Sequence, residues 1–249
     1  MVLRKEPKNY LDTVPDPTAL TGNELAKSRS TRRRILDAAR DILATQGYAR
    51  FSTLAVAERA GLTRPAMLYH FGSRLELVKA TIHHLARRRI EIFEIAMGEL
   101  HIEPGFKGQA IRAALVDVLW SQLQVPEFAA FTELVNAART DPDLKAIIDP
   151  ALVAFDESRF DATQRALPDG SYDEDDFELS RDVVRFLMEG VMQQNSISTR
   201  REERLAAIHH FLTMLVATTP GNAFLEAVMD DWKQKRAAGP ALRDRGLSD

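Results

Sequence analysis

Side chains that can donate hydrogen bonds to phosphates and to base edges are concentrated between residues 52 and 74. Arg64 is the best candidate for reading base sequence, because a planar guanidinium can donate to both O6 and N7 of guanine. The other donors suit phosphates, whose contacts position a protein on DNA without reading its sequence. The expected phosphate contacts are Ser52, Thr53, Thr63, Tyr69, His70 and Arg74, together with Arg32 upstream.

Some of these residues have a structural alternative. Arg64 could contact phosphate alone, and His70 could be packed inside the domain. Ala66 and Met67 could each touch the methyl group of a thymine, although Met67 suits a hydrophobic core equally well. The residue types therefore favour a nucleic-acid interface and leave several individual contacts open.

Two short helices joined by a tight turn are predicted to present these side chains. Ser52 or Thr53 caps the first helix, which runs to about Ala60. Gly61 ends it, because glycine takes the left-handed conformation at little cost. Thr63 caps the second helix.

The end of the second helix is equally well marked. Pro65 lies in its first turn, where a missing N–H does no harm, and Gly72 ends it. Ser73 and Glu76 form a capping box for a third, longer helix. The result is a helix-turn-helix, the arrangement that lets its second helix lie in the DNA major groove.

The charge distribution supports this interpretation. The whole chain of 249 residues has a net charge of −3, but residues 27–79 hold 11 Lys/Arg against 4 Asp/Glu, a net charge of +7. Residues 80–249 hold 19 against 28, a net charge of −9. A basic segment on an acidic body indicates that only the first part meets a polyanion.

The rest of the chain also predicts helices, since no β-branched alternation occurs. Helices are expected over residues 31–46, 74–97, 107–124, 126–139, 141–167, 176–195 and 199–218, and over a last piece at 224–232. A break is expected at Pro220-Gly221-Asn222. In the helix from residue 74, Leu75, Val78, Ile82 and Leu85 are expected to face inward and Arg87–Arg89 to be solvated.

These elements predict four parts: a flexible arm over 1–26, a helix-turn-helix domain over 27–79 with its recognition helix at about 64–71, a helical ligand-binding and dimerisation domain over 80–236, and a frayed tail over 237–249.

Enzymatic and metal chemistry find little support. The chain has no cysteine, and four of its six histidines form the adjacent pairs His83-His84 and His209-His210, without metal-ligand spacing. No phosphate-binding or nucleophile motif is present. We expect no enzyme activity, cofactor or metal. No apolar run is long enough to span a bilayer, so we expect a cytoplasmic protein with no membrane partner.

The helix-turn-helix stretch resembles the TetR family of transcriptional regulators. The resemblance rests on Ala57-x-x-Ala60-Gly61-Leu62-Thr63 and on Tyr69-His70-Phe71-Gly72-Ser73-Arg74-x-Glu76-Leu77. Two positions depart from the family: Pro65 replaces a usual glycine, and Leu68 replaces a tyrosine that commonly touches the DNA backbone.

The resemblance implies an all-α fold, with an N-terminal three-helix head and a larger C-terminal helical domain. It also implies a homodimer that binds double-stranded DNA at a palindromic operator, acts as a repressor, and is released by an unidentified, largely apolar small effector. The alternatives are control by a protein partner, absence of an effector, or activation. A further possibility, outside transcriptional regulation, is a purely structural helical module.

Two sets of body residues follow from this resemblance. The effector pocket is expected to include Trp120, Phe128, Phe131, Val135, Phe155, Arg159, Met188 and Met192, although aromatic residues at helical spacing are also typical of plain core. The dimer interface is expected to pair helices 176–195 and 199–218 in a four-helix bundle. Its residues are Val183, Val184, Leu187, Gly190, Val191, Leu205, Ile208, Leu212 and Leu215, unless these stripes face the core of the protomer.

Overall fold

A computed structural model describes residues 8–19, 26–100, 108–166, 174–194 and 201–237, and throughout these ranges the regular secondary structure is helical. The expected all-α class is confirmed. The predicted frayed tail beyond Ala237 lies outside the described residues, as do the first seven residues of the predicted arm.

The chain forms two compact units, one of Met1–His101 with Ser121–Arg165 and one of Ile102–Trp120 with Ala166–Asp249. The elements of the first unit are η1 (Tyr10–Thr13), α1 (Ala26–Gln46), η2 (Tyr48–Arg50), α2 (Thr53–Arg59), α3 (Arg64–Phe71), α4 (Arg74–Glu99), α6 (Pro126–Ala138) and α7 (Pro142–Ala166). The proposed functional boundary after residue 79 therefore lies within this unit, along α4.

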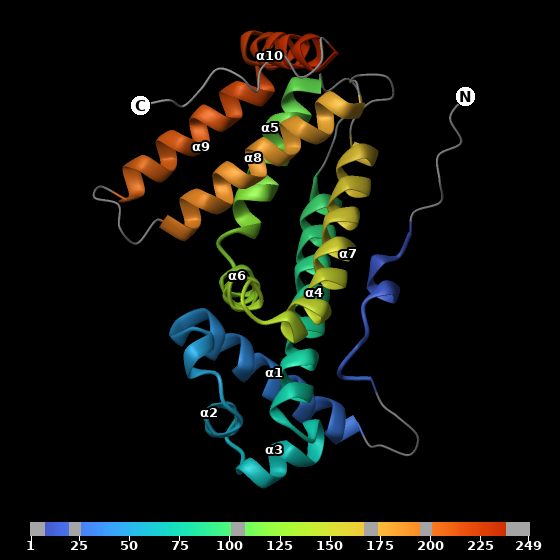
Figure 1. The fold of residues 1–249 in the computed structure, drawn as a ribbon, viewed down its shortest axis with the longest axis vertical. Coiled ribbons are helices and arrows are strands. Elements are labelled where there is room, and N and C mark those ends of the chain that lie inside the picture. The colour runs from blue at the N-terminus through green and yellow to red at the C-terminus, as the bar shows by residue number, and fades with distance from the viewer. Residues whose placement is uncertain (1–7, 20–25, 101–107, 167–173, 195–200, 238–249) are drawn as a thin grey trace. The chain divides into compact units, whose positions relative to one another are not determined.

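The core of the first unit joins the helix-turn-helix to the helices that follow it. α1 packs against α2, α3, α4 and α6, and α4 lies beside α7 (Figure 1). Its largest fully buried side chains come from five helices: Ile35, Leu36, Ile42, Leu43, Met67, Leu77, Ile82, Leu85, Ile90, Phe131, Leu134 and Ile148. The basic head is thus continuous with part of the body.

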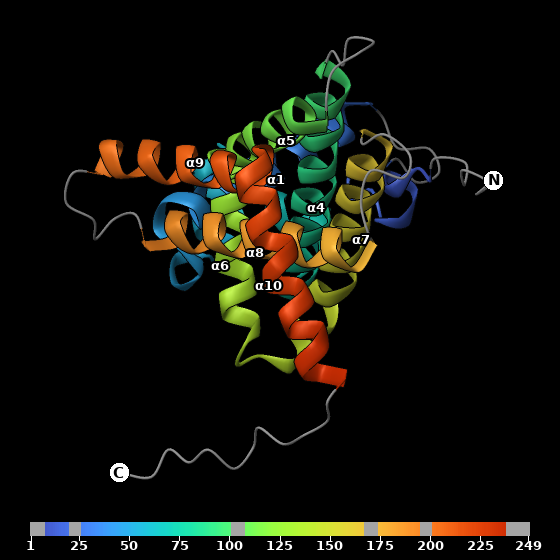
Figure 2. The same cartoon turned by 90° about the horizontal axis from the view of Figure 1, so that it is seen from above.

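The second unit contains α5 (Gly108–Gln122), α8 (Glu174–Gln194), α9 (Arg201–Ala217) and α10 (Thr219–Ala237). α9 packs against α10 and α8, and Figure 2 shows α10 crossing α8. α10 begins five residues before the expected piece at 224–232. Pro220 does not break it, since proline is tolerated in a first helical turn.

Three expectations for α1 and α4 are wrong. α1 starts at Ala26 rather than near Thr31, whose hydroxyl bonds back to the carbonyl of Lys27 at 2.9 Å. Leu75 is exposed at the first turn of α4, whereas Val78, Ile82 and Leu85 are buried as expected. Arg89 is only 8% exposed and Arg87 is half-buried, so Arg87–Arg89 is not a solvated run.

The N-terminal segment, residues 8–19, is not loosely attached as expected. Tyr10 and Val14 are buried, and the Tyr10 hydroxyl donates to Asp161 on α7. Arg87 on α4 donates to the carbonyls of Leu11 and Val14. The proline-rich composition concealed this attachment, because its partners lie far along the chain.

Removal of the Tyr10 hydroxyl by Tyr10→Phe is expected to destabilise the protein by about 1 kcal/mol at neutral pH, because Asp161 loses a hydrogen bond. Burial, the hydrogen bond and the charge of Asp161 raise the pKa of Tyr10. The stabilisation by this phenol is therefore full below its unfolded-state pKa of about 10 and is lost as pH rises through the folded value. Urea unfolding at about pH 8 and about pH 10.5 should show a smaller difference between wild type and variant at the higher pH. A difference independent of pH would contradict this account.

Candidate nucleic-acid interface

The start of α2 and the turn after it follow directly from local sequence. The Ser52 hydroxyl accepts the amide hydrogen bond of Ala55 at 3.1 Å, which caps α2. Gly61 has φ of +65°, and the Leu62 amide donates to the Ala57 carbonyl at 2.9 Å to close the helix end. α2 thereby ends where the chain must turn into α3.

α3 is also capped by a side-chain hydroxyl at its start and ended by a glycine. The Thr63 hydroxyl accepts from the Ala66 amide at 3.3 Å, and Pro65 lies in the first turn. Met67 and Phe71 are buried and anchor the helix, which assigns Met67 to the core. Gly72, with φ of +64°, then ends α3.

The outer face of α3 carries polar side chains that reach solvent. Arg64 and Tyr69 are exposed, and Tyr69 at 85% is the most exposed of the large hydrophobic and aromatic residues described. Its ring meets that of His70 edge-on at 5.3 Å. Ala66, Leu68 and His70 are half-buried, so they border this face.

Arg64 is held at the junction of α2 and α3. Its Nε donates to the Thr53 hydroxyl at 3.2 Å. A guanidinium has five N–H donors, and this bond uses one of them. The remaining fork is available to a base or a phosphate, while Thr53 fixes the direction of the side chain.

Arg74 packs against a turn that the sequence analysis missed. Its guanidinium lies over the rings of Tyr48 and Phe51, at 5.2 Å and 5.9 Å from their centroids. The two rings are stacked 6.2 Å apart, one from the first residue of η2 and one from the residue that follows η2. Cation–π contact fixes the Arg74 side chain and leaves its charge at the surface. The available signal in the sequence was the presence of two aromatic residues, Tyr48 and Phe51, directly before the helix-turn-helix.

Arg32 differs from the other expected DNA contacts. Its guanidinium donates to the carbonyl of Ala19 at 2.8 Å, in the N-terminal segment. The structure therefore brings Ser52, Thr53, Thr63, Arg64, Tyr69, His70 and Arg74 to the helix-turn-helix, and it ties Arg32 to another part of the chain.

The expected pocket residues of the first unit surround a cation. Arg89 lies over Phe155 at 3.9 Å from the ring centroid, over Phe131 at 4.7 Å and over Phe128 at 5.9 Å. Arg159, 6% exposed, also lies over Phe155, at 5.5 Å. Arg89 follows Leu85 by four residues on the apolar stripe of α4, a spacing that could have revealed it. Val135 is half-buried on α6.

The remaining pocket candidates belong to the second unit. Trp120 is half-buried, with its ring 5.1 Å from that of His209, which pairs with Asp117 at 2.9 Å. Met188 is fully buried and Met192 half-buried.

The expected dimer residues divide into two groups. Val183, Leu187 and Gly190 are exposed, and Val191, Leu205, Ile208 and Leu215 are half-buried. Val184 and Leu212 are buried within the protomer, so the assignment of these two to the dimer surface is wrong. Phe186, Phe211 and Met214 are exposed apolar residues that the sequence analysis missed.

The described ranges carry no sign of two other kinds of site, a metal centre and a membrane-spanning helix. Those residues contain no group of three or more His, Cys, Asp or Glu side chains placed to hold a metal ion. No helix among them is both long and apolar enough to cross a bilayer.

Comparison with known proteins gives a consistent result. Residues 35–81 match the family described as "Bacterial regulatory proteins, tetR family". An uncharacterized HTH-type transcriptional regulator of Mycobacterium tuberculosis is 29% identical over 196 residues, 74% of this chain and 97% of that protein.

Two further proteins are similar in sequence or structure. The uncharacterized HTH-type transcriptional regulator TtgW of Pseudomonas putida is 31% identical over 110 residues, 44% of this chain and 75% of that protein. The TetR-like regulator LfrR of Mycobacterium smegmatis, solved in complex with proflavine, is 26% identical with a TM-score of 0.50, over 76% of this chain and 97% of that one. The chain belongs to the TetR family of DNA-binding transcriptional regulators, which are not enzymes.

Proposed function

We propose that the protein is a homodimeric repressor that binds a palindromic operator and is released from it by a small, largely apolar effector. The observation that carries the DNA-binding part is α3, which is anchored by Met67 and Phe71 and presents Arg64 and Tyr69 to solvent. A duplex that accepts α3 in its major groove meets the capped end of α2 at the same time. Ser52, Thr53, Thr63, His70 and Arg74 then serve as phosphate contacts.

The exposed apolar residues of α8 and α9 support the homodimer. Phe186 and Leu187 on α8 are exposed, as are Phe211 and Met214 on α9. Large exposed apolar side chains on neighbouring helices are typical of a protein interface. Two-fold pairing of these helices makes a four-helix bundle and places two heads on one operator.

The small effector is supported by the similarity to LfrR, which was solved in complex with proflavine. Release requires only that the effector prefer the conformation that binds DNA poorly. A regulator acts where the chromosome lies, so a cytoplasmic location is part of this proposal.

The first test is a fluorescence anisotropy titration against the intergenic DNA upstream of the gene itself, at two salt concentrations. We expect saturable binding that protects a palindrome and weakens steeply with salt, since phosphate contacts release counterions. Selection of bound fragments from the whole genome finds the operator if it lies elsewhere. No preference for any fragment over random DNA would contradict sequence-specific binding. If no small molecule released the protein from its operator but another protein from the same cell did, control by a protein partner would be favoured.

Leu187→Glu is expected to weaken the dimer without unfolding the protomer, because Leu187 is 46% exposed in the single chain. A charge at the centre of an apolar interface costs at least about 2 kcal/mol, which raises the dimer dissociation constant about 30-fold. Sedimentation velocity over a concentration series measures the change. Val153→Glu is the matched control, because Val153 is similarly exposed on α7, outside the proposed interface. Equal effects of the two substitutions would exclude α8 as the interface.

A further inference from the structure

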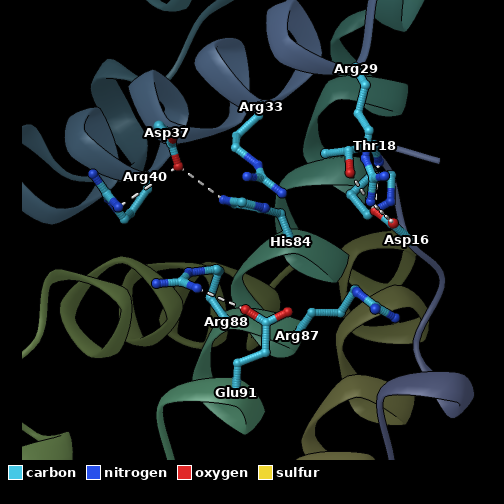
Figure 3. A pocket seen from close by; sticks show the side chains of 11 residues that line it. Asp16, Thr18, Arg29, Arg33, Asp37, Arg40, His84, Arg87, Arg88 and Glu91 are labelled. Carbon is cyan, nitrogen blue, oxygen red and sulfur yellow. Dashed lines mark hydrogen bonds and ion pairs between the residues drawn. The ribbon is translucent and has the colours of Figure 1, made fainter. Parts of the chain in front are cut away.

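A charged pocket lies within the first unit, between the N-terminal segment, α1 and α4 (Figure 3). Its volume is about 350 Å³, within the range of small-ligand sites. Asp16 and Thr18 line it from the segment, and α1 and α4 supply the rest of its charged residues. The proposed effector is apolar, and this pocket is not suited to it.

Cations outnumber anions in the lining. Five guanidiniums and one imidazole line the pocket, from Arg29, Arg33, Arg40, Arg87, Arg88 and His84. The lining carboxylates come from Asp16, Asp37 and Glu91. With His84 neutral, the lining therefore carries a net charge of about +2.

Each lining carboxylate already has partners. Asp16 accepts from the amide and hydroxyl of Thr18, at 2.8 Å and 2.7 Å. Glu91 pairs with Arg88 at 2.8 Å.

Asp37 is held from both helices. It lies 3.2 Å from His84 and 3.8 Å from Arg40. The hydrogen bond with His84 lowers the pKa of Asp37, so this carboxylate stays ionised at neutral pH. The net charge of about +2 therefore already includes the negative charge of Asp37.

Two of the five guanidiniums account for this excess, because Arg29, Arg40 and Arg88 pair with the three lining carboxylates. Arg87 is held by the carbonyls of Leu11 and Val14, which carry no formal charge. The guanidinium of Arg33 points into the pocket toward His84 (Figure 3). Guanidiniums bind carboxylate and phosphate oxygens through paired N–H donors, which gives charge-assisted hydrogen bonds.

DNA phosphates do not account for this site. The pocket residues of α4 begin at His84, ten residues after Arg74. At 1.5 Å per residue, the pocket starts roughly 15 Å along α4 from the end that meets DNA.

We propose that this pocket binds a small organic or inorganic anion that carries at least two phosphate or carboxylate groups. An anion here contacts α1 and α4 together. α1 packs against α2 and α3, and α4 follows α3 directly, so occupancy biases the position of the recognition helix. The proposal that an anion binds depends only on the pocket. The proposal that this anion regulates the protein rests on the proposed operator binding.

The binding test uses the full chain with inorganic pyrophosphate and citrate as probes, by isothermal titration calorimetry without DNA. Sodium chloride keeps the ionic strength constant, which separates site binding from screening. We expect saturable binding of at least one probe. Arg33→Gln should weaken it about tenfold, the loss expected when a charged hydrogen-bond partner is removed.

Two further variants sharpen the test. Arg34→Gln makes the same charge change at the next residue of α1, which is exposed and does not line the pocket, and it should leave the affinity unchanged. Glu91→Gln removes a lining carboxylate and should strengthen anion binding. Binding of neither probe, or equal weakening by the two arginine variants, would overturn the proposal.

The regulatory part is tested by operator titration with and without pyrophosphate. We expect pyrophosphate to change the operator affinity of the wild type, and the same change in Arg33→Gln to require about tenfold more pyrophosphate. An equal effect on both proteins at the same pyrophosphate concentrations would mean direct competition for DNA contacts and would overturn this part. If the pocket binds no anion, calorimetry shows no binding of either probe. If the proposed function is wrong, the protein does not bind the operator even when no anion is present.

Discussion

Arg64→Ala is expected to lower the affinity for the operator by between about fivefold and 150-fold, with little change for random DNA. Bidentate contact with guanine contributes about 1–3 kcal/mol of discrimination, which corresponds to this range. Thr53 orients the guanidinium at 3.2 Å, so the contact requires little ordering on binding. Anisotropy titrations on operator and random duplexes at one salt concentration measure the two affinities separately.

The controls distinguish base reading from charge. Arg59→Ala removes an exposed arginine from the same head, where its partner is Asp41 at 3.1 Å, and should affect the two duplexes equally. Arg64→Lys keeps the charge but loses the planar fork, so it should resemble Arg64→Ala on the operator. A loss of equal size on the operator and on random DNA would mean that Arg64 contacts phosphate alone.

Arg89→Ala is expected to lower the free energy of unfolding by about 3 kcal/mol, because it removes a desolvated cation–π centre and leaves a cavity. The guanidinium lies over the rings of Phe128, Phe131 and Phe155, and its side chain is 8% exposed. Urea unfolding followed by circular dichroism measures the change.

Two comparisons define what Arg89 contributes. Arg89→Lys should recover only part of the loss, because lysine keeps the charge but cannot stack as a plane on Phe155. Arg139→Ala, at the exposed end of α6, should change stability by less than about 0.5 kcal/mol. If Arg89→Ala were as mild as this control, Arg89 would not be a structural centre.

Local signals predicted the helix-turn-helix well. Ser52, Thr63 and Ser73 cap their helices as expected, and Gly61 and Gly72 both have a positive φ. Caps and glycine stops act over a few residues, so a single sequence contains what is needed to place them.

Long-range contacts were the part that the sequence could not supply. The attachment of Tyr10 depends on Asp161, and the position of Arg89 depends on three phenylalanines from two later helices. A basic residue in a helix suggests solvent by default, and only tertiary packing reverses this for Arg89. Arg74 was expected at the DNA-binding surface, but its packing on Tyr48 and Phe51 was not, because these rings lie on a turn with no regular period.

The attachment of the N-terminal segment also determines the order in which the protein can be completed during synthesis. Tyr10 and its partner Asp161 are 151 residues apart, so the ribosome must add those residues before the contact can form. At about 5–20 residues per second, this takes on the order of ten seconds. The N-terminal segment is therefore synthesised early but can pack against α7 only late. In the interval its apolar side chains are accessible to chaperones and proteases on the nascent chain.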